Sequence, residues 1–307
     1  MSSGKKVLCV TANPCVDRVM WFQGDQERPS RTFRQLGGKG VNVARMMGWL
    51  GHTVVSLTFG GGRERLLADR DPCRTVLVPA AQGIREIPLR IYPDRGETRL
   101  EYHNTNRVSP EEAEAFLSAY RRELAAGPEL VAISGSACAG SEGTIPVMVR
   151  LAKEQGLPVI LDSYGQCFLD SLPEGPDYVK PNREELEQAV GTVPPGEEAE
   201  AARALIARGA GCVLLTLGDQ GAWCVTREEA IFQPVFPVPV VSAVGCGDTF
   251  TAYFAHGLLA GWPLGRCFAT GSAAGAANAM RSISGRTRKN QVDQVLRRAG
   301  LATIDTR

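Results

Sequence analysis

A glycine-rich turn between residues 244 and 249 has the residue types of an anion-binding loop. The segment reads VPVVSAVGCGDTFTAYFAHGLL from Val238 to Leu259. Its pattern predicts a strand over Val238–Ser242, a turn, and a helix over Thr249–Ala260. Glycines allow a tight turn that approaches a ligand closely, and a helix N-terminus offers unpaired N–H groups to an anion. The sequence has no GxxxxGK[ST] pattern, so this design differs from a P-loop.

The four residues at the turn suggest the chemistry. Gly245, Cys246 and Gly247 would form the anion hole with their backbone, and Asp248 would lie beside it. Phosphoryl transfer needs positioning, charge stabilisation and a carboxylate that accepts the hydroxyl proton. Asp248 would be that base. The competing interpretation is that Asp248 is a helix N-cap and has no chemical role.

A second glycine-rich segment, LGGKGVNVAR, occupies residues 36–45. Gly37 and Gly38 permit close backbone approach. Asn42 can donate and accept hydrogen bonds and therefore suits neighbouring sugar hydroxyls. Lys39 would hold a substrate phosphate or be solvated.

The segment YVKPNREEL, residues 178–186, combines a cation, an amide and a carboxylate. Lys180 could neutralise a nucleotide phosphate. Asn182 and Glu185 are three residues apart at a helix start, which suits a hydrated Mg²⁺ but also a capping box. The spacing alone favours the capping box.

The segment LLTLGDQGAW, residues 214–223, is a strand followed by a turn. It places Thr216, Gly218 and Gly221 after a strand, where loops of open α/β sheets line ligand clefts.

The elements that must position these residues alternate between apolar strands and helices, which predicts a parallel sheet covered on both faces. The expected strands are Val7–Thr11, Val54–Phe59, Leu130–Ser134, Val159–Asp162, Tyr178–Lys180 and Val213–Leu217, with a hairpin through Ala222–Val225 and Ile231–Phe232. The other expected helices are Gly40–Gly51, Pro110–Ala126, Gly143–Gly156, Arg183–Val190, Glu197–Gly209, Leu264–Met280 and Asn290–Ala299.

Two polar segments, 18–36 and 84–104, break this pattern and read as strands that alternate sides. A small second sheet standing off the main one would explain them. Such an outgrowth suits a lid, because a phosphoryl-transfer site must exclude water. We expect one domain over residues 1–307 that carries this lid.

Composition limits the partners. The 307 residues carry a net charge of +1, which removes the electrostatic argument for nucleic acid or an anionic membrane. No apolar run is long enough to span a bilayer, and the N-terminus lacks the apolar region of a signal peptide. The nine cysteines are odd in number and contain no CxxC pair, which favours buried free thiols in a cytoplasmic protein.

The four segments, in this order, resemble the PfkB or ribokinase-like carbohydrate kinase family. GGKGVNVAR is similar to its first signature and VVSAVGCGDTFTA to its second. Within that family, TANPCVDR (11–18), ISGS (133–136) and YVKPNREEL look most like the branch of 1-phosphofructokinases and tagatose-6-phosphate kinases. The resemblance covers nearly the whole chain. It implies a three-layer αβα fold with a mainly parallel sheet and a β lid.

The resemblance also implies ligands and roles. ATP would be the phosphoryl donor, with Mg²⁺, and a sugar or sugar phosphate the acceptor. Asp248 would be the catalytic base, and the lid would cover the sugar and, as one option, form a homodimer contact. The implied binding residues are Asp17, Gly37, Gly38, Lys39, Asn42 and Arg90 for the substrate, Lys180, Asn182, Thr216, Gly218, Gly221 and Asn278 for the nucleotide, and Glu185 for the metal.

Departures from the family pattern lie mainly on the sugar side. The segment at residues 60–79 is shortened, ACAG replaces a usual LPSG at 137–140, and Pro88 interrupts the strand that carries Arg85 and Arg90. Either arginine could bind a substrate phosphate. Two alternatives therefore stay open: a kinase for an unphosphorylated sugar or a nucleoside, and a catalytically inactive sensor on the same fold.

Overall fold

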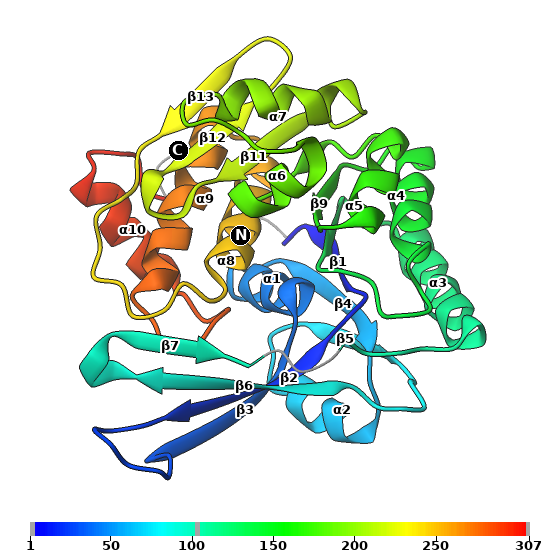
Figure 1. The fold of residues 1–307 in the computed structure, drawn as a ribbon. Helices are drawn as coiled ribbons and strands as arrows, with labels where there is room; N and C mark the ends of the chain where they lie inside the picture. The colour runs from blue at the N-terminus through cyan, green and yellow to red at the C-terminus, as the bar shows by residue number, and fades with distance from the viewer. Residues whose placement is uncertain (1–3, 102–104, 305–307) are drawn as a thin grey trace.

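The computed structural model describes residues 4–101 and 105–304, and its main sheet has nine strands (Figure 1). Counted across the sheet from β5 at one edge, each strand is parallel to its neighbour as far as β11. At the other edge, β12 pairs antiparallel with β11 and with β13. In spatial order the strands are β13 (Ala230–Gln233), β12 (Ala222–Val225), β11 (Cys212–Thr216), β10 (Tyr178–Val179), β9 (Val159–Asp162), β8 (Leu130–Ser134), β1 (Lys6–Thr11), β4 (Thr53–Phe59) and β5 (Arg74–Val78).

Helices cover both faces of this sheet. Alternate residues of β1 show the layering, because Leu8 and Val10 join one apolar cluster while Val7 and Cys9 join another. The first cluster includes buried residues of α3 (Pro110–Ala125), α4 (Thr144–Glu154), α5 (Gln166–Ser171), α6 (Arg183–Val190) and α7 (Glu198–Ala207). The second includes α1 (Lys39–Trp49), α8 (Cys246–Leu259), α9 (Leu264–Ala279) and α10 (Lys289–Arg298). The fold is therefore the expected three-layer αβα arrangement.

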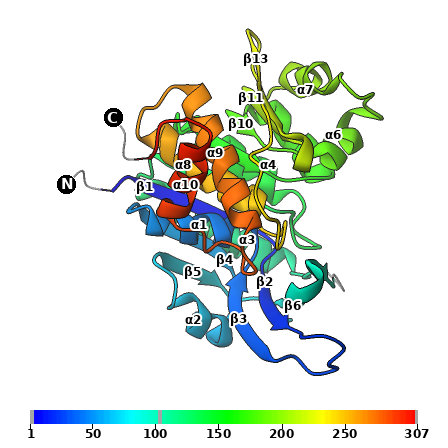
Figure 2. The ribbon, with the colours of Figure 1, turned by 90° about the vertical axis from the view of Figure 1, so that its left-hand side faces the viewer.

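A separate four-stranded sheet extends away from these layers, below them in Figures 1 and 2. Its order is β3 (Arg31–Gly37), β2 (Cys15–Trp21), β6 (Arg85–Tyr92) and β7 (Glu97–Leu100). These strands come from the two polar segments that the sequence singles out, although residues 102–104 of the second lie outside the described residues. Helix α2 (Gly62–Ala68) contributes Ala68 to a small cluster with Leu36 of β3. Neither α2, α5 nor β5 was expected.

One predicted strand is wrong. Residues 238–242 form no strand, and the backbone N–H groups of Val241 and Ser242 both donate to the Ala279 carbonyl instead. Pro237 and Pro239 provide the reason, because neither has an N–H group to give to a strand ladder.

The described residues contain no helix that is long and apolar enough to cross a membrane. The nine cysteines are free thiols, and seven of them are buried, as the sequence led us to expect.

The start of α3 allows a direct test of these local assignments. Ser109 accepts a hydrogen bond from the Glu112 N–H at 3.2 Å, and the Glu112 carboxylate accepts from the Ser109 N–H at 2.7 Å. We expect Ser109→Ala to lower the free energy of unfolding by about 1 kcal/mol, measured by urea denaturation. Ser118→Ala in the middle of the same helix is the control, since alanine is a good helix former. Equal effects of the two substitutions would contradict the capping assignment.

Candidate active site

Two cavities meet at Asp248, near the carboxyl ends of the parallel strands. The first has a volume of about 720 Å³ and the second about 560 Å³. Six residues line both cavities: Lys39, Asn182, Glu185, Ala243, Gly245 and Asp248. A ligand in one cavity would therefore face a ligand in the other across the Asp248 carboxylate.

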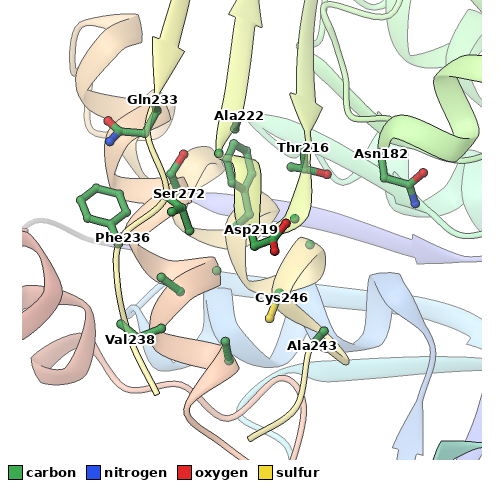
Figure 3. Close-up of a pocket in the computed structure, with 18 of the residues that line it drawn as sticks. Asn182, Thr216, Asp219, Ala222, Gln233, Phe236, Val238, Ala243, Cys246 and Ser272 are labelled. Atoms are coloured by element: carbon green, nitrogen blue, oxygen red, sulfur yellow. The ribbon is translucent and has the colours of Figure 1, made fainter. Parts of the chain in front are cut away.

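The first cavity is open to the loops that follow β10 and β11. Asn182 and Thr216 lie at its edge, and Cys246 lies across from them at the beginning of α8 (Figure 3). Gly218 and Gly221 also line it, and an apolar wall includes Phe236. Apolar walls with a few polar groups are typical of small-molecule sites. The cavity thus contains all but one of the residues that the resemblance assigns to a nucleotide.

The exception is Asn278, which the resemblance also assigns to the nucleotide. Its side chain is fully buried and does not line either cavity. Its amide nitrogen donates to the Val244 carbonyl at 2.9 Å, and its oxygen accepts from the hydroxyls of Thr249 and Thr287. Asn278 therefore holds the turn before α8 in place, because each of these bonds ties α9 to a neighbouring segment.

Helix α8 begins at Cys246, three residues before the predicted start. Gly245 is its N-cap residue with φ at +79°, a conformation that favours glycine, and a Cβ there would lie 2.4 Å from the Ser284 Cβ. Asp248 lies inside the first turn, so the interpretation of Asp248 as N-cap is wrong. The backbone of Gly245, Cys246 and Gly247 lines the first cavity at the positive end of the helix dipole.

Asp248 is buried, and its carboxylate does not cap α8, whose N-cap residue is Gly245. The Asn42 amide nitrogen donates to one carboxylate oxygen at 2.8 Å. Burial and the charge of Asp162 raise the Asp248 pKa to about 6, while Lys39, Asn42 and Lys180 act in the opposite direction. Asp248 is therefore ionised at neutral pH, with a pKa well placed for a general base.

Asp162 holds two lysines beside that base. Its carboxylate lies 2.9 Å from Lys39 Nζ and 3.1 Å from Lys180 Nζ. Burial opposes the charge of Asp162, yet the two lysines lower its pKa below the usual value. A Cβ on Gly247 would lie 2.9 Å from Lys180 Nζ, so this ammonium group is adjacent to the anion hole. Asp162 is the last residue of β9; it is fully buried and lines neither cavity itself, but it contacts two lysines that line the first cavity.

Asn182 and Glu185 form the capping box that their spacing favours. The Glu185 N–H donates to the Asn182 side chain at 2.8 Å, and the Asn182 N–H donates to Glu185 at 2.9 Å. The other Glu185 oxygen lies 3.4 Å from Lys39 Nζ. Among the described residues, no cluster of three or more His, Cys, Asp or Glu side chains could hold a metal. The Asn182 amide and the Glu185 carboxylate alone would fit a Mg²⁺ that keeps its waters and takes few protein ligands.

The second cavity lies between the main sheet and the small sheet. Asp17, Gly38, Lys39 and Asn42 line it, as expected for substrate binding. Gly37 does not line it but packs against Asp17, because a Cβ there would lie 2.5 Å from the Asp17 carboxylate. Burial raises the Asp17 pKa, against hydrogen bonds from Gln35 and Cys15 that lower it.

Arg90, which the resemblance assigns to the substrate, lines neither cavity. Arg85, Ile87 and Leu89 of β6 line the second cavity, and alternate residues of a strand point to opposite faces. Arg90 is on the other face, where its guanidinium lies 2.6 Å from the Glu101 carboxylate. The period of two along β6 is the signal that selects Arg85 over Arg90.

Comparisons with known proteins agree with this geometry. The family model described as pfkB family carbohydrate kinase matches residues 7–287. The chain belongs to the pfkB family of carbohydrate kinases. It is 32% identical to the 1-phosphofructokinase of Rhodobacter capsulatus over 84% of this chain and 85% of that protein. It is 28% identical to the tagatose-6-phosphate kinase of Staphylococcus epidermidis over 95% of this chain and 97% of that protein.

Solved structures share the fold. Phosphofructokinase-2 from Escherichia coli in complex with substrates and products superposes with a TM-score of 0.83, at 24% identity, over 95% of this chain and 98% of that one. Ribokinase from Arabidopsis thaliana superposes with a TM-score of 0.69, at 20% identity, over 95% and 98%. The protein is thus a phosphotransferase that acts on a sugar hydroxyl, with the ribokinase-like fold.

The raised pKa of Asp248 predicts the pH dependence of this pfkB kinase. A base works only when ionised, so kcat/KM should fall about tenfold for each pH unit below about pH 6. An ordinary aspartate would keep the rate constant down to about pH 4. Initial rates in buffers of constant ionic strength between pH 4.5 and 8 measure this limb, with circular dichroism as the control for folding. A flat profile down to pH 5 would contradict Asp248 as the titrating base.

Proposed function

We propose that this protein transfers the γ-phosphoryl group of ATP to a hydroxyl of a phosphorylated ketose, with Asp248 as the base. The observation that carries the proposal is the meeting of two cavities at Asp248. The cavity on one side contains the anion-binding N-terminus of α8, and the cavity on the other contains Arg85. The names of the two curated relatives, a 1-phosphofructokinase and a tagatose-6-phosphate kinase, support a ketose phosphate as acceptor.

In this proposal the chain acts by positioning and by one proton transfer. The γ-phosphate lies against the backbone N–H groups at Gly245–Gly247, and the Lys180 ammonium group lies beside Gly247. Asp248 accepts the acceptor hydroxyl proton as that oxygen bonds to phosphorus and the bond to the ADP leaving group breaks. Asp17 and Asn42 hold other hydroxyls of the sugar. Mg²⁺, held on the phosphates and by Glu185, would neutralise developing phosphate charge.

Arg85 is proposed as the ligand of the substrate phosphate. Lys39 is the other cation that lines the second cavity. It lies close to Asp162 and Glu185, and its pKa is raised because these carboxylates and Asp248 outweigh the effect of burial. Arg85 lies on the cavity face of the small sheet. A guanidinium binds phosphate through two parallel hydrogen bonds, which gives both affinity and orientation.

The small sheet would then serve as a lid over the sugar. A homodimer through this sheet stays a prediction from the resemblance, and a cytoplasmic location stays a prediction from the cysteines and the N-terminal sequence. Gel filtration coupled to light scattering would measure the oligomeric state.

Release of ADP in the presence of ATP and Mg²⁺ tests the proposed function. The acceptor panel is fructose 1-phosphate, fructose 6-phosphate, tagatose 6-phosphate, fructose, ribose and adenosine. We expect turnover on one of the ketose phosphates, and Asp248→Asn should lower kcat by about 100-fold to 10,000-fold because it removes the base. ATP binding, measured by calorimetry, should survive in that variant. Turnover confined to fructose, ribose or adenosine would overturn the phosphorylated acceptor, and sugar binding without ADP release would indicate a sensor.

Substitution of the two lid arginines tests the phosphate assignment. Arg85→Gln should raise the KM for the ketose phosphate by about tenfold or more, because a charge-assisted hydrogen bond is lost. The KM for ATP should stay unchanged. Arg90→Gln is the matched control on the same strand, paired with Glu101 on the opposite face. The assignment fails if Arg90→Gln has the larger effect.

A further inference from the structure

Behind the proposed base lies a buried chain of hydrogen bonds, of which Asp248 and Asn42 line a cavity while Arg45 and Asp71 line neither. It runs from Asp248 to Asn42 and Arg45 on α1 and ends at Asp71, in the turn between α2 and β5. The Arg45 side chain is fully buried, and that of Asp71 is 3% exposed. A buried ion pair is costly to assemble unless its geometry is good and its remaining donors are satisfied.

Arg45 meets that requirement through the shape of its guanidinium. Its Nε and Nη2 atoms lie 2.6 and 2.9 Å from the two Asp71 oxygens, which is a bidentate contact. Nη2 also donates to the Leu36 carbonyl at 2.6 Å. Nη1 donates to the Asn42 side-chain oxygen at 2.9 Å. Two partners thus fix the plane of the guanidinium, and the third contact points at Asn42.

The direction of these bonds determines the orientation of the Asn42 amide. A guanidinium donates hydrogen bonds and accepts none, so the amide oxygen of Asn42 must face Arg45. The amide nitrogen then faces Asp248, where it donates to the ionised carboxylate at 2.8 Å. If the amide were reversed, the Asn42 oxygen would face the ionised Asp248 carboxylate. Both oxygens are acceptors, so no hydrogen bond could form between them. Gly285 packs closely against the Asn42 amide, since a Cβ on Gly285 would lie 2.7 Å from the Asn42 oxygen.

We propose that Arg45, held by Asp71, is a positioning residue that fixes the Asn42 amide so that its N–H donates to Asp248. The proposal rests on the proposed role of Asp248 as base. Its consequence is that the turn at Asp71, in the segment that the resemblance marks as shortened, affects the proton-accepting group through two intervening side chains.

Two variants disturb this chain without changing its charge. Arg45→Lys keeps the positive charge but cannot form the three contacts, because an ammonium group lacks the planar fork. Gly285→Ala places a methyl group against Asn42 and Arg45, 2.7 and 3.0 Å from their polar atoms. Asp162, Lys39 and Lys180, the charged groups that act on Asp248, are untouched in both.

Matched controls separate positioning from stability. Gly156→Ala replaces a glycine of similar conformation, with φ at +69° against +63° for Gly285, but in open space. Tyr120→Phe removes a buried hydrogen bond, from the Tyr120 hydroxyl to the Met148 carbonyl at 2.8 Å, in the opposite helical layer. Both controls should lower Tm and leave kcat within about twofold of the wild-type value.

Kinetics and a carboxyl titration provide the readouts. We expect both test variants to lower kcat by about tenfold or more, with the KM for ATP within about twofold of the wild-type value. The ¹³C carboxyl resonance of Asp248, assigned with Asp248→Asn, titrates without substrate and should shift to a pKa higher by about half a unit or more. If Arg45→Lys does not fold, the comparison of Gly285→Ala with Gly156→Ala still tests the positioning role.

The outcomes distinguish this inference from the proposed function. Test variants that match their controls in kcat and in the Asp248 titration, even with a lower Tm, would overturn the positioning role. Wild-type protein without turnover on the panel, but with the expected shift of the titration, would overturn the proposed function and leave the positioning of Asp248 supported.

Discussion

The structure depends on one constraint, which is that a buried carboxylate must stay ionised where two ligands meet. Removal of a carboxylate from water favours its protonated form unless nearby charges and donors compensate. Asp248 is compensated by the Asn42 amide and by the charges of Lys39 and Lys180, and it is opposed by Asp162. The balance gives a pKa of about 6, so the carboxylate is ionised at neutral pH but still able to accept a proton, as the proposed base must be.

The fold brings these groups together from distant parts of the chain. Asp162 ends β9, Lys180 follows β10 and Thr216 ends β11, so parallel strands deliver them to the same edge of the sheet. Helices α1 and α8 pack against each other on one face and begin at this edge (Figure 1). Their first turns carry Asn42 and Asp248. The small sheet then closes the second cavity with residues from β2, β6 and β7.

The sequence predicts much of this arrangement because its signals are local. Apolar runs define the buried strands, and the glycines before α1 and α8 mark the turns where ligands approach. Asn182 caps its helix as the spacing to Glu185 indicates. The misplaced strand at 238–242 shows the limit of composition, since alternating prolines remove the ladder donors.

Side-chain direction accounts for most of what the sequence did not predict. Asn278 is near the nucleotide cavity in space but turns toward the loop at Val244, which no local pattern indicates. Arg85 and Arg90 differ only in strand parity, and that parity is decided by pairing with β2. The contact of Arg45 with Asp71 joins residues 26 positions apart, and it follows from the packing of α1 against β1 and β4.

A crystal structure with a non-hydrolysable ATP analogue and the preferred ketose phosphate tests the central claim most directly. The account predicts the γ-phosphate against the N–H groups of Gly245–Gly247 and an acceptor hydroxyl within about 3.2 Å of an Asp248 oxygen. The sugar phosphate should contact Arg85. A γ-phosphate away from the start of α8, or an acceptor hydroxyl whose nearest carboxylate is not Asp248, would contradict the account.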